Sequence, residues 1–245
     1  MYQRVIVLVT ALLFALGLPG FGQEGERMDK ARLMVRVIPQ PREVTVSAAD
    51  FVLDAGAAIV LGKPDDEQDR FAVETLRDDL RMLWGAELPV AAKARKPVLV
   101  GVASRDAAVR EACQRKGLKV TAELGDEGYV LAVDAEGVVA AANAAPGVFY
   151  ALQTLRQLVR RADGKAAFQG VRIRDWPGLR YRGVQDDVSR GPVPTMDYFK
   201  KEIRTLAAFK VNVFCLYVEH VFKFEKHPEI APEGGEITAQ QIREL

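Results

Sequence analysis

Short apolar runs separated by turn-forming residues fill the first half of the chain, a pattern typical of β-strands. The segments VRVIPQPREVTV and FVLDAGAAIVLG are interrupted by Pro39, Pro41 and Gly56 and predict short strands. The apolar run at 97–102 predicts a buried strand. The segments GYVLAV and VVAAAN are joined by a polar turn at 134–137, and together they predict a β-hairpin.

Helical periodicity alternates with these strands. The segment DEQDRFAVETLRDDLRMLWG predicts a helix that ends at Gly85. A second helix, SRDAAVREACQRKG, has Ser104 or Asp106 near its N-cap and Gly117 past its end. The apolar face expected for the first helix consists of Leu76, Leu80, Leu83 and Trp84.

A third helix is predicted over APGVFYALQTLRQLVRR, with three arginines near the negative end of its dipole. Together these elements predict an α+β domain over residues 30–165, in which no group of residues resembles a catalytic site. The apolar stripe of the third helix consists of Val148, Leu152, Leu155 and Val159, and its arginines are Arg156, Arg160 and Arg161.

A second unit, residues 176–245, shows a different pattern. Residues 182–189 predict a strand, TMDYFKKEIRTLAAFK predicts a helix capped by Thr195, and the uncharged run at 211–218 predicts a second strand. A strand, a helix and a strand that is buried on both faces are typical of a parallel βαβ unit. A last helix opens at ITAQQIREL, where Thr238 and Gln241 fit a capping box. Since no strand follows, we expect a parallel domain that is truncated.

Composition narrows the class of protein. The chain of 245 residues is 49% hydrophobic and 27% charged, as in ordinary globular proteins. Its 34 basic and 33 acidic residues nearly balance, so we expect no nucleic-acid partner and no attraction to an anionic membrane.

The first 22 residues differ in pattern from the rest of the chain. Arg4 precedes an apolar run at 5–18, which is followed by a Pro-Gly break and a small-residue cleavage pattern before Gln23. This predicts a signal peptide over residues 1–22 and a secreted or periplasmic protein with no membrane association after cleavage. The alternative is a membrane anchor, but the run is shorter than the roughly 20 residues that span a bilayer. Cys113 and Cys215 are expected to be two buried free thiols.

Candidate chemistry lies where the two strands of the second unit end. Ligands of parallel α/β domains bind at the carboxyl ends of strands, so Asp186, Asp187, Arg190, Glu219 and His220 are expected to converge. Guanidinium donors beside carboxylate acceptors suit a neutral polyhydroxyl ligand. Ion pairing of Arg190 with Asp187 or Glu219 is the structural alternative.

Two further alternatives concern the same segment. His220 and His227 lie near Glu219, but their spacing matches no zinc pattern, so we expect no metal and no cofactor. Asp186 is expected to point away from Asp187, because successive residues of a strand face opposite sides.

On these residues the chain resembles the glycoside hydrolase family 20 β-N-acetylhexosaminidases. VIPQPREV, DEGYVLAV and APGVFYALQTLRQLV resemble the N-terminal accessory domain of that family, and WPGLRYRGVQDDVSRG with FKVNVF resembles the opening of its (β/α)8 catalytic barrel. The resemblance implies an α/β chain in which an α+β accessory domain is followed by the first two β/α units of an incomplete TIM barrel. Arg190 would then grip hydroxyls of the terminal sugar.

The resemblance also implies a reaction. Such enzymes remove terminal N-acetylhexosamine from amino-sugar glycans or oligosaccharides with retention, assisted by the acetamido group of the substrate. Their catalytic Asp-Glu pair belongs to a later strand, so no catalytic residue is expected in this chain, and the chain alone is expected to be inactive. The chain departs from the family where Glu219 or His220 stands for a sugar-binding aspartate and Gly191 replaces a histidine. A non-catalytic carbohydrate-binding or scaffold protein and a different barrel glycosidase are the competing hypotheses.

Overall fold

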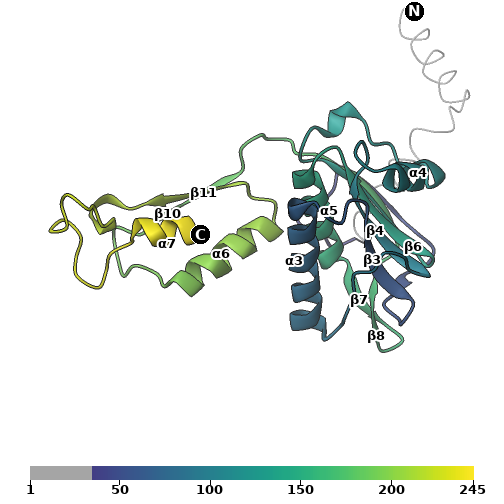
Figure 1. Ribbon diagram of the computed structural model, residues 1–245, viewed down its shortest axis with the longest axis horizontal. Helices are drawn as coiled ribbons and strands as arrows, with labels where there is room; N and C mark the ends of the chain where they lie inside the picture. Colours follow the sequence, from purple (N-terminus) through teal and green to yellow (C-terminus); the bar gives the residue numbers. More distant parts are fainter. Residues whose placement is uncertain (1–34) are drawn as a thin grey trace, which may run out of the picture.

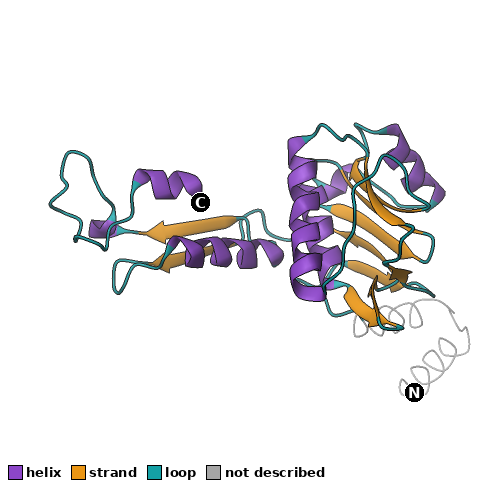
Figure 2. Cartoon of the chain, turned by 60° about the horizontal axis from the view of Figure 1, so that its bottom comes forward, coloured by secondary structure: helices purple, strands orange, loops and turns teal. Residues whose placement is uncertain are grey.

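The computed structural model describes residues 35–245, so the predicted signal peptide lies outside the described residues. Figure 1 shows two lobes, which we define as the first lobe (residues 35–175) and the second lobe (residues 183–245). The first lobe is a sheet covered by helices, and the second projects from it as a narrow arm (Figure 2).

The first lobe is built on a mixed six-stranded sheet. Its strand order is β1-β9-β5-β6-β4-β3, in which β3, β4 and β6 run parallel and the remaining pairs are antiparallel. The β5–β6 pair is the predicted hairpin, which confirms that prediction. The bounds are β1 Glu43–Val46, β3 Ala57–Leu61, β4 Lys96–Val102, β5 Tyr129–Asp134, β6 Gly137–Ala142 and β9 Val171–Asp175.

Helices cover both faces of this sheet. Helix α3 (Glu67–Trp84) and helix α5 (Ala145–Gln157) pack on one face over the larger apolar core, and α4 (Ala107–Arg115) packs on the other over a smaller one. Because both faces are covered, every residue of β6 is buried. The central strands accordingly read as continuous apolar runs rather than as alternating ones.

The ends of α3 and α4 follow the predicted capping chemistry. The side chain of Asp66 accepts hydrogen bonds from the backbone of Gln68 and Asp69 at the start of α3, and Gly85 ends that helix with a φ of 60°. Asp106, one of the two predicted caps, accepts from the backbone of Val109 at the start of α4. The predicted face of α3 is partly wrong, since Leu83 is 61% exposed, whereas Leu76 and Leu80 are buried.

The end of the third helix differs from the prediction. Helix α5 stops at Gln157, and Arg160 and Arg161 lie on the strand β7 instead of on the helix. Arg160 forms a bidentate ion pair with Asp50, in which both nitrogen–oxygen distances are 2.6 Å. This distant partner and the pairing of β7 with its neighbour outweigh the helical pattern. The small sheet has the order β2-β8-β7, with β2 Phe51–Val52, β8 Lys165–Phe168 and β7 Val159–Ala162.

The second lobe contains the predicted βαβ unit. Strands β10 (Gly183–Asp187) and β11 (Val213–Tyr217) are parallel, and α6 (Met196–Ala208) connects them, capped by Thr195 as predicted. Helix α7 (Ala239–Glu244) opens with the predicted capping box. Two short 3-10 turns, η1 (Ala122–Leu124) and η2 (Glu219–Val221), complete the described elements.

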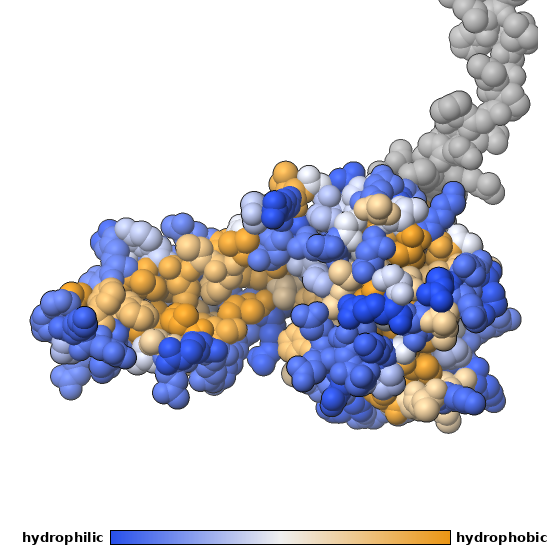
Figure 3. Space-filling view, turned by 45° about the horizontal axis from the view of Figure 1, so that its top comes forward, coloured by the Kyte–Doolittle hydropathy of each residue, from blue (hydrophilic) through white to orange (hydrophobic). Residues whose placement is uncertain are grey.

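The second lobe departs from the prediction in its burial. One face of β10 and β11 packs on α6 and a small core around Phe199, but the opposite face is exposed, so the strands are not buried on both faces. Cys215 lies on that exposed face, which makes the expectation of two buried thiols wrong for this residue and right for Cys113. Figure 3 shows apolar residues gathered along this lobe.

Candidate functional site

The parallel pairing of β10 and β11 brings their carboxyl ends to one edge. The register runs from Gly183 opposite Val213 to Asp187 opposite Tyr217. The residues that follow each strand therefore leave the sheet side by side. We call residues 187–190 and 217–220 the rim.

Arg190 and Glu219 meet at the rim. Nη2 of Arg190 donates to Oε1 of Glu219 at 2.9 Å, and the hydroxyl of Tyr217 donates to the same oxygen at 2.7 Å. The side chain of Arg190 remains 68% exposed and that of Glu219 30% exposed. Most of the guanidinium and part of the carboxylate therefore face solvent, where both can contact a ligand.

The backbone at Glu219 is unusual. Its φ is 37°, in the left-handed region that few residues other than glycine adopt. The residue sits at the first position of η2, immediately after the strand, where this turn directs its carboxylate toward Arg190.

Asp187 lies at the rim but does not pair with the arginine. Its Oδ1 accepts from the hydroxyl of Ser189 at 2.6 Å and from the backbone N–H of Ser189 at 3.0 Å. These hydrogen bonds, with a smaller contribution from the charge of Arg190, lower the pKa of Asp187. Of the two ion pairs proposed for Arg190, the structure contains the one with Glu219.

Two of the predicted residues do not join this group. Asp186 points toward α6, where its charge adds to the effect of burial and raises the pKa of Glu202. The expectation that all five residues converge is therefore wrong for Asp186, and the expected alternation with Asp187 explains why. His220 is exposed, and within residues 35–245 no hydrogen bond or ion pair holds its ring.

Sequence reasoning missed Tyr217 and Ser189. The hydrogen bond to Glu219, followed by the charge of that carboxylate, raises the pKa of the Tyr217 phenol, which therefore remains a donor. Tyr217 is two positions before Glu219 at the end of the strand, and this spacing was the available signal.

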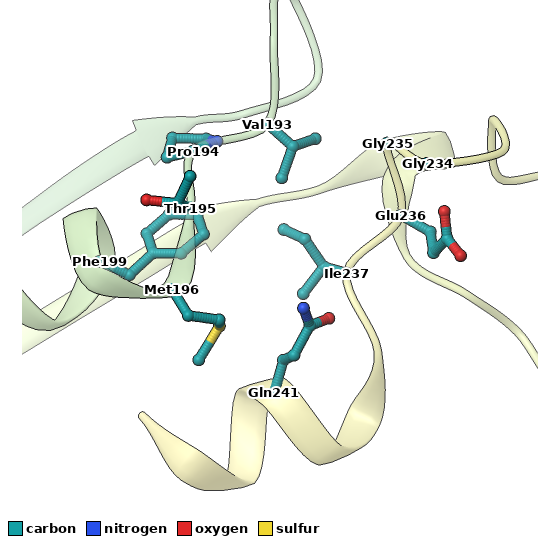
Figure 4. Close-up of a pocket in the computed structure, with 10 residues that line it drawn as sticks. All are labelled: Val193, Pro194, Thr195, Met196, Phe199, Gly234, Gly235, Glu236, Ile237 and Gln241. Atoms are coloured by element: carbon teal, nitrogen blue, oxygen red, sulfur yellow. The ribbon is translucent and has the colours of Figure 1, made fainter.

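A small cavity lies in the second lobe apart from the rim. Its volume is about 190 Å³, and it is enclosed by the start of α6, the preceding loop and the segment before α7 (Figure 4). Oε2 of Glu236, one of its lining residues, has no hydrogen-bond partner among the described residues. None of the rim residues lines this cavity.

Across residues 35–245, no group of three or more His, Cys, Asp or Glu residues is arranged to hold a metal ion. The same part of the chain includes no helix with the length and apolar character needed to cross a membrane. Nδ1 of His227 lies 3.4 Å from Oε1 of Glu229.

The chain is similar in sequence to known glycoside hydrolases. Residues 34–176 match the family model described as glycosyl hydrolase family 20, domain 2. A beta-hexosaminidase of Porphyromonas gingivalis is 27% identical over 86% of this chain and 28% of its own length. A beta-N-acetylhexosaminidase of Cellulomonas fimi is 32% identical over 75% of this chain and 34% of its own length. The chain thus spans about a third of the length of these curated relatives.

A solved structure agrees with these sequence matches. The GH20 beta-N-acetylhexosaminidase of Streptomyces coelicolor superposes with a TM-score of 0.68 at 26% identity, covering 86% of this chain and 43% of that protein. The mixed α/β fold is shared across this alignment, which extends beyond the region matched by the family model. The chain therefore belongs to glycosyl hydrolase family 20.

Proposed function

We propose that these residues form the N-terminal part of an exported glycoside hydrolase that removes terminal N-acetylhexosamine from amino-sugar glycans. Family membership and the names of the relatives support a hexosaminidase. The observation that carries the proposal for this chain is the Arg190–Glu219 pair at the carboxyl ends of two parallel strands.

The second lobe is proposed to be the opening of a (β/α)8 barrel. The parallel order β10-α6-β11 is the repeating unit of such a barrel. One face of both strands lacks an apolar covering among the described residues, and on β11 this face carries Val213 at 40% and Tyr217 at 42% exposure. Further strands of a longer polypeptide would bury this face, and the domain division at residues 176–245 rests on the same argument.

Arg190 and Glu219 are proposed to bind the sugar together. A guanidinium offers five N–H donors and a carboxylate offers acceptors, so a neighbouring pair can hold adjacent hydroxyl groups of a ring. Glu219 is preferred over His220 because Glu219 contacts the arginine and His220 does not. Asp187 supports the loop that carries Arg190, through its hydrogen bonds to Ser189.

The reaction is proposed to proceed with retention and with assistance from the acetamido group of the substrate. The carboxylate pair that this mechanism requires is expected on a later strand, as the family resemblance implies. The chain of 245 residues by itself is accordingly expected to bind sugar weakly and to hydrolyse none.

Kinetics of the native polypeptide that carries these residues test the proposal. The native protein should hydrolyse 4-nitrophenyl N-acetyl-β-glucosaminide, and Arg190→Ala should lower kcat/KM by a factor of about 10 to 100, since one hydrogen bond to a charged group is worth about 1.5–3 kcal/mol. The matched control is Arg115→Ala, an exposed arginine on α4. Sugar binding without hydrolysis would favour the non-catalytic carbohydrate-binding protein, and the absence of both would overturn the proposal.

Export has a separate test. The proposed signal peptide predicts that the mature protein outside the cytoplasm begins at Gln23. Mass spectrometry of the N-terminal peptide would show this residue, whereas a mature protein that retains residues 1–22 would contradict cleavage.

A further inference from the structure

Lys210 joins the second lobe to the first. It lies just beyond α6, is only 6% exposed, and its side chain enters the first lobe. Its Nζ donates to Oδ2 of Asp175 at 2.8 Å and to the hydroxyl of Tyr129 at 2.9 Å. The Tyr129 hydroxyl also contacts Thr154 at 2.6 Å and Asp175 at 3.1 Å. The ammonium group is therefore held by a buried polar network on β5, α5 and β9.

The backbone at Lys210 adopts a conformation that is unfavourable for a lysine. The residue adopts a φ of 62° where the chain turns out of the helix, a left-handed conformation that glycine usually supplies. A lysine at this position costs free energy relative to glycine. A lysine is nevertheless found at this position, which is explained if the buried contacts of its side chain with Asp175 and Tyr129 offset the free-energy cost of the backbone.

A second set of contacts lies beside the lysine. Nη2 of Arg182 donates to Oε2 of Glu127 at 2.7 Å, and Nδ2 of Asn212 donates to Oε1 of the same carboxylate at 2.9 Å. Arg182 also donates through Nε to the carbonyl of Lys210 at 2.7 Å. Arg182 and Asn212 immediately precede β10 and β11. Both strands are thus tied at their starts to one glutamate of the first lobe.

We propose that Lys210, with Arg182 and Asn212, forms a charged joint through which the first lobe sets the direction of β10 and β11. Ion pairs and hydrogen bonds need defined geometry, whereas apolar contacts tolerate sliding, so a buried polar joint selects one orientation of the lobes. Lys210 is a positioning residue in this scheme. The first lobe is the template that determines where the rim lies. The proposed joint does not depend on the proposed function; only the use of the rim to bind sugar does.

Distances between spin labels on the two lobes test the joint without any sugar. The labels are placed at Gln114→Cys on α4 and Lys201→Cys on α6, both exposed, in a Cys215→Ser background in which Cys113 stays buried. The parent chain should give one narrow distance distribution. Lys210→Met should broaden it at least twofold or add a second distance, while hydrogen exchange of β5 and β6 stays protected. Lys200→Met, at a lysine on α6 paired with Glu244, is the matched control and should leave the distribution narrow.

A second variant separates the side chain from the backbone. If the Lys210 side chain were unimportant, Lys210→Gly would relieve the left-handed backbone and raise the urea midpoint of the chain. If the joint holds the lobes as proposed, Lys210→Gly should instead lower the urea midpoint and broaden the distribution of distances between the labels. An unchanged distance distribution in Lys210→Met, or a raised midpoint in Lys210→Gly, would overturn the proposal. Neither readout involves sugar, so failure of the proposed enzyme function would leave these results unaffected.

Discussion

The guanidinium of Arg190 lies 2.9 Å from the carboxylate of Glu219, although 29 residues separate them in the chain. The parallel pairing of β10 with β11 creates this contact, because it brings the two strand ends to one edge. The pair is exposed and anchored on one side by Tyr217. This arrangement suits a role in binding better than a role in stability.

Glu219→Gln should therefore have little effect on folding. Exposed ion pairs contribute between about 0 and 1 kcal/mol, since solvent screens them. We expect the free energy of unfolding, measured with urea, to change by less than about 1 kcal/mol. In the native polypeptide, the same substitution should raise KM for the glycoside, because a charged acceptor is lost. A loss of several kcal/mol in stability would show that the pair is structural.

Asp69 should make the stability of the chain depend on pH. It is 2% exposed, and its Oδ1 has no hydrogen-bond partner among the described residues. Burial, helped by the charge of Asp66, raises the pKa of Asp69 from 3.8 to about 6. The folded chain thus holds this proton more tightly than the unfolded chain. Its stabilising effect is complete below about pH 4 and is lost as the pH rises through about 6.

Asp69→Asn should accordingly gain stability relative to the parent chain as the pH rises from 4 to 8, by at most about 3 kcal/mol. Urea unfolding at a series of pH values measures the difference. Asp66→Asn is the matched variant, because it keeps a capping side chain but removes the neighbouring charge. Without that charge the pKa of Asp69 should fall, so the loss of stability should occur at a lower pH. A stability difference that does not vary with pH would contradict this account.

Gly147 should tolerate no side chain. A Cβ at this position would lie 2.3 Å from the carbonyl oxygen of Gly128 and 2.7 Å from Cβ of Ala142, where α5 approaches the sheet. Gly147→Ala should cost about 1–3 kcal/mol or more, because backbone has to move. Gly191 is the control, since a Cβ there meets nothing within 4 Å. Equal thermal midpoints for the two alanine variants would contradict the close approach.

The two cysteines should differ in reactivity. Cys113 is buried, which raises its pKa to about 11, and Cys215 is exposed. Because the thiolate is the reactive form, a thiol reagent at pH 8 should modify one cysteine per folded chain and two after unfolding. If further strands cover β11 in the native polypeptide, Cys215 should become protected there. Rapid modification of both thiols in the folded chain would contradict the packing of α4.

Local signals made much of the first lobe predictable. Gly85 ends α3 because it can adopt the left-handed turn there, and the polar turn at 134–137 fixes the β5–β6 hairpin. The prediction fails at Arg160 and Arg161 because both lie on β7, which pairs with β8, and the main side-chain partner of Arg160 is not local. Arg160 pairs with a carboxylate that lies 110 residues earlier, which helical periodicity does not report.

The rim was predictable in part for the same reason. The rule that parallel strand ends meet predicted the proximity of Arg190 and Glu219, and alternation along the strand predicted that Asp186 turns away. The choice between Glu219 and His220 depends on a single turn with positive φ, which sequence patterns do not reveal. The buried position of Lys210 was also not predictable, because its partners come from β5 and β9.

A crystal structure of the native polypeptide with N-acetylglucosamine-thiazoline, a mimic of the cyclised intermediate, tests sugar binding by Arg190 and Glu219 most directly. The guanidinium nitrogens of Arg190 should lie about 2.7–3.2 Å from ring hydroxyl oxygens, and the Glu219 carboxylate should accept a hydrogen bond from a neighbouring hydroxyl. A sugar bound away from the ends of β10 and β11, with Arg190 still directed only at Glu219, would contradict it.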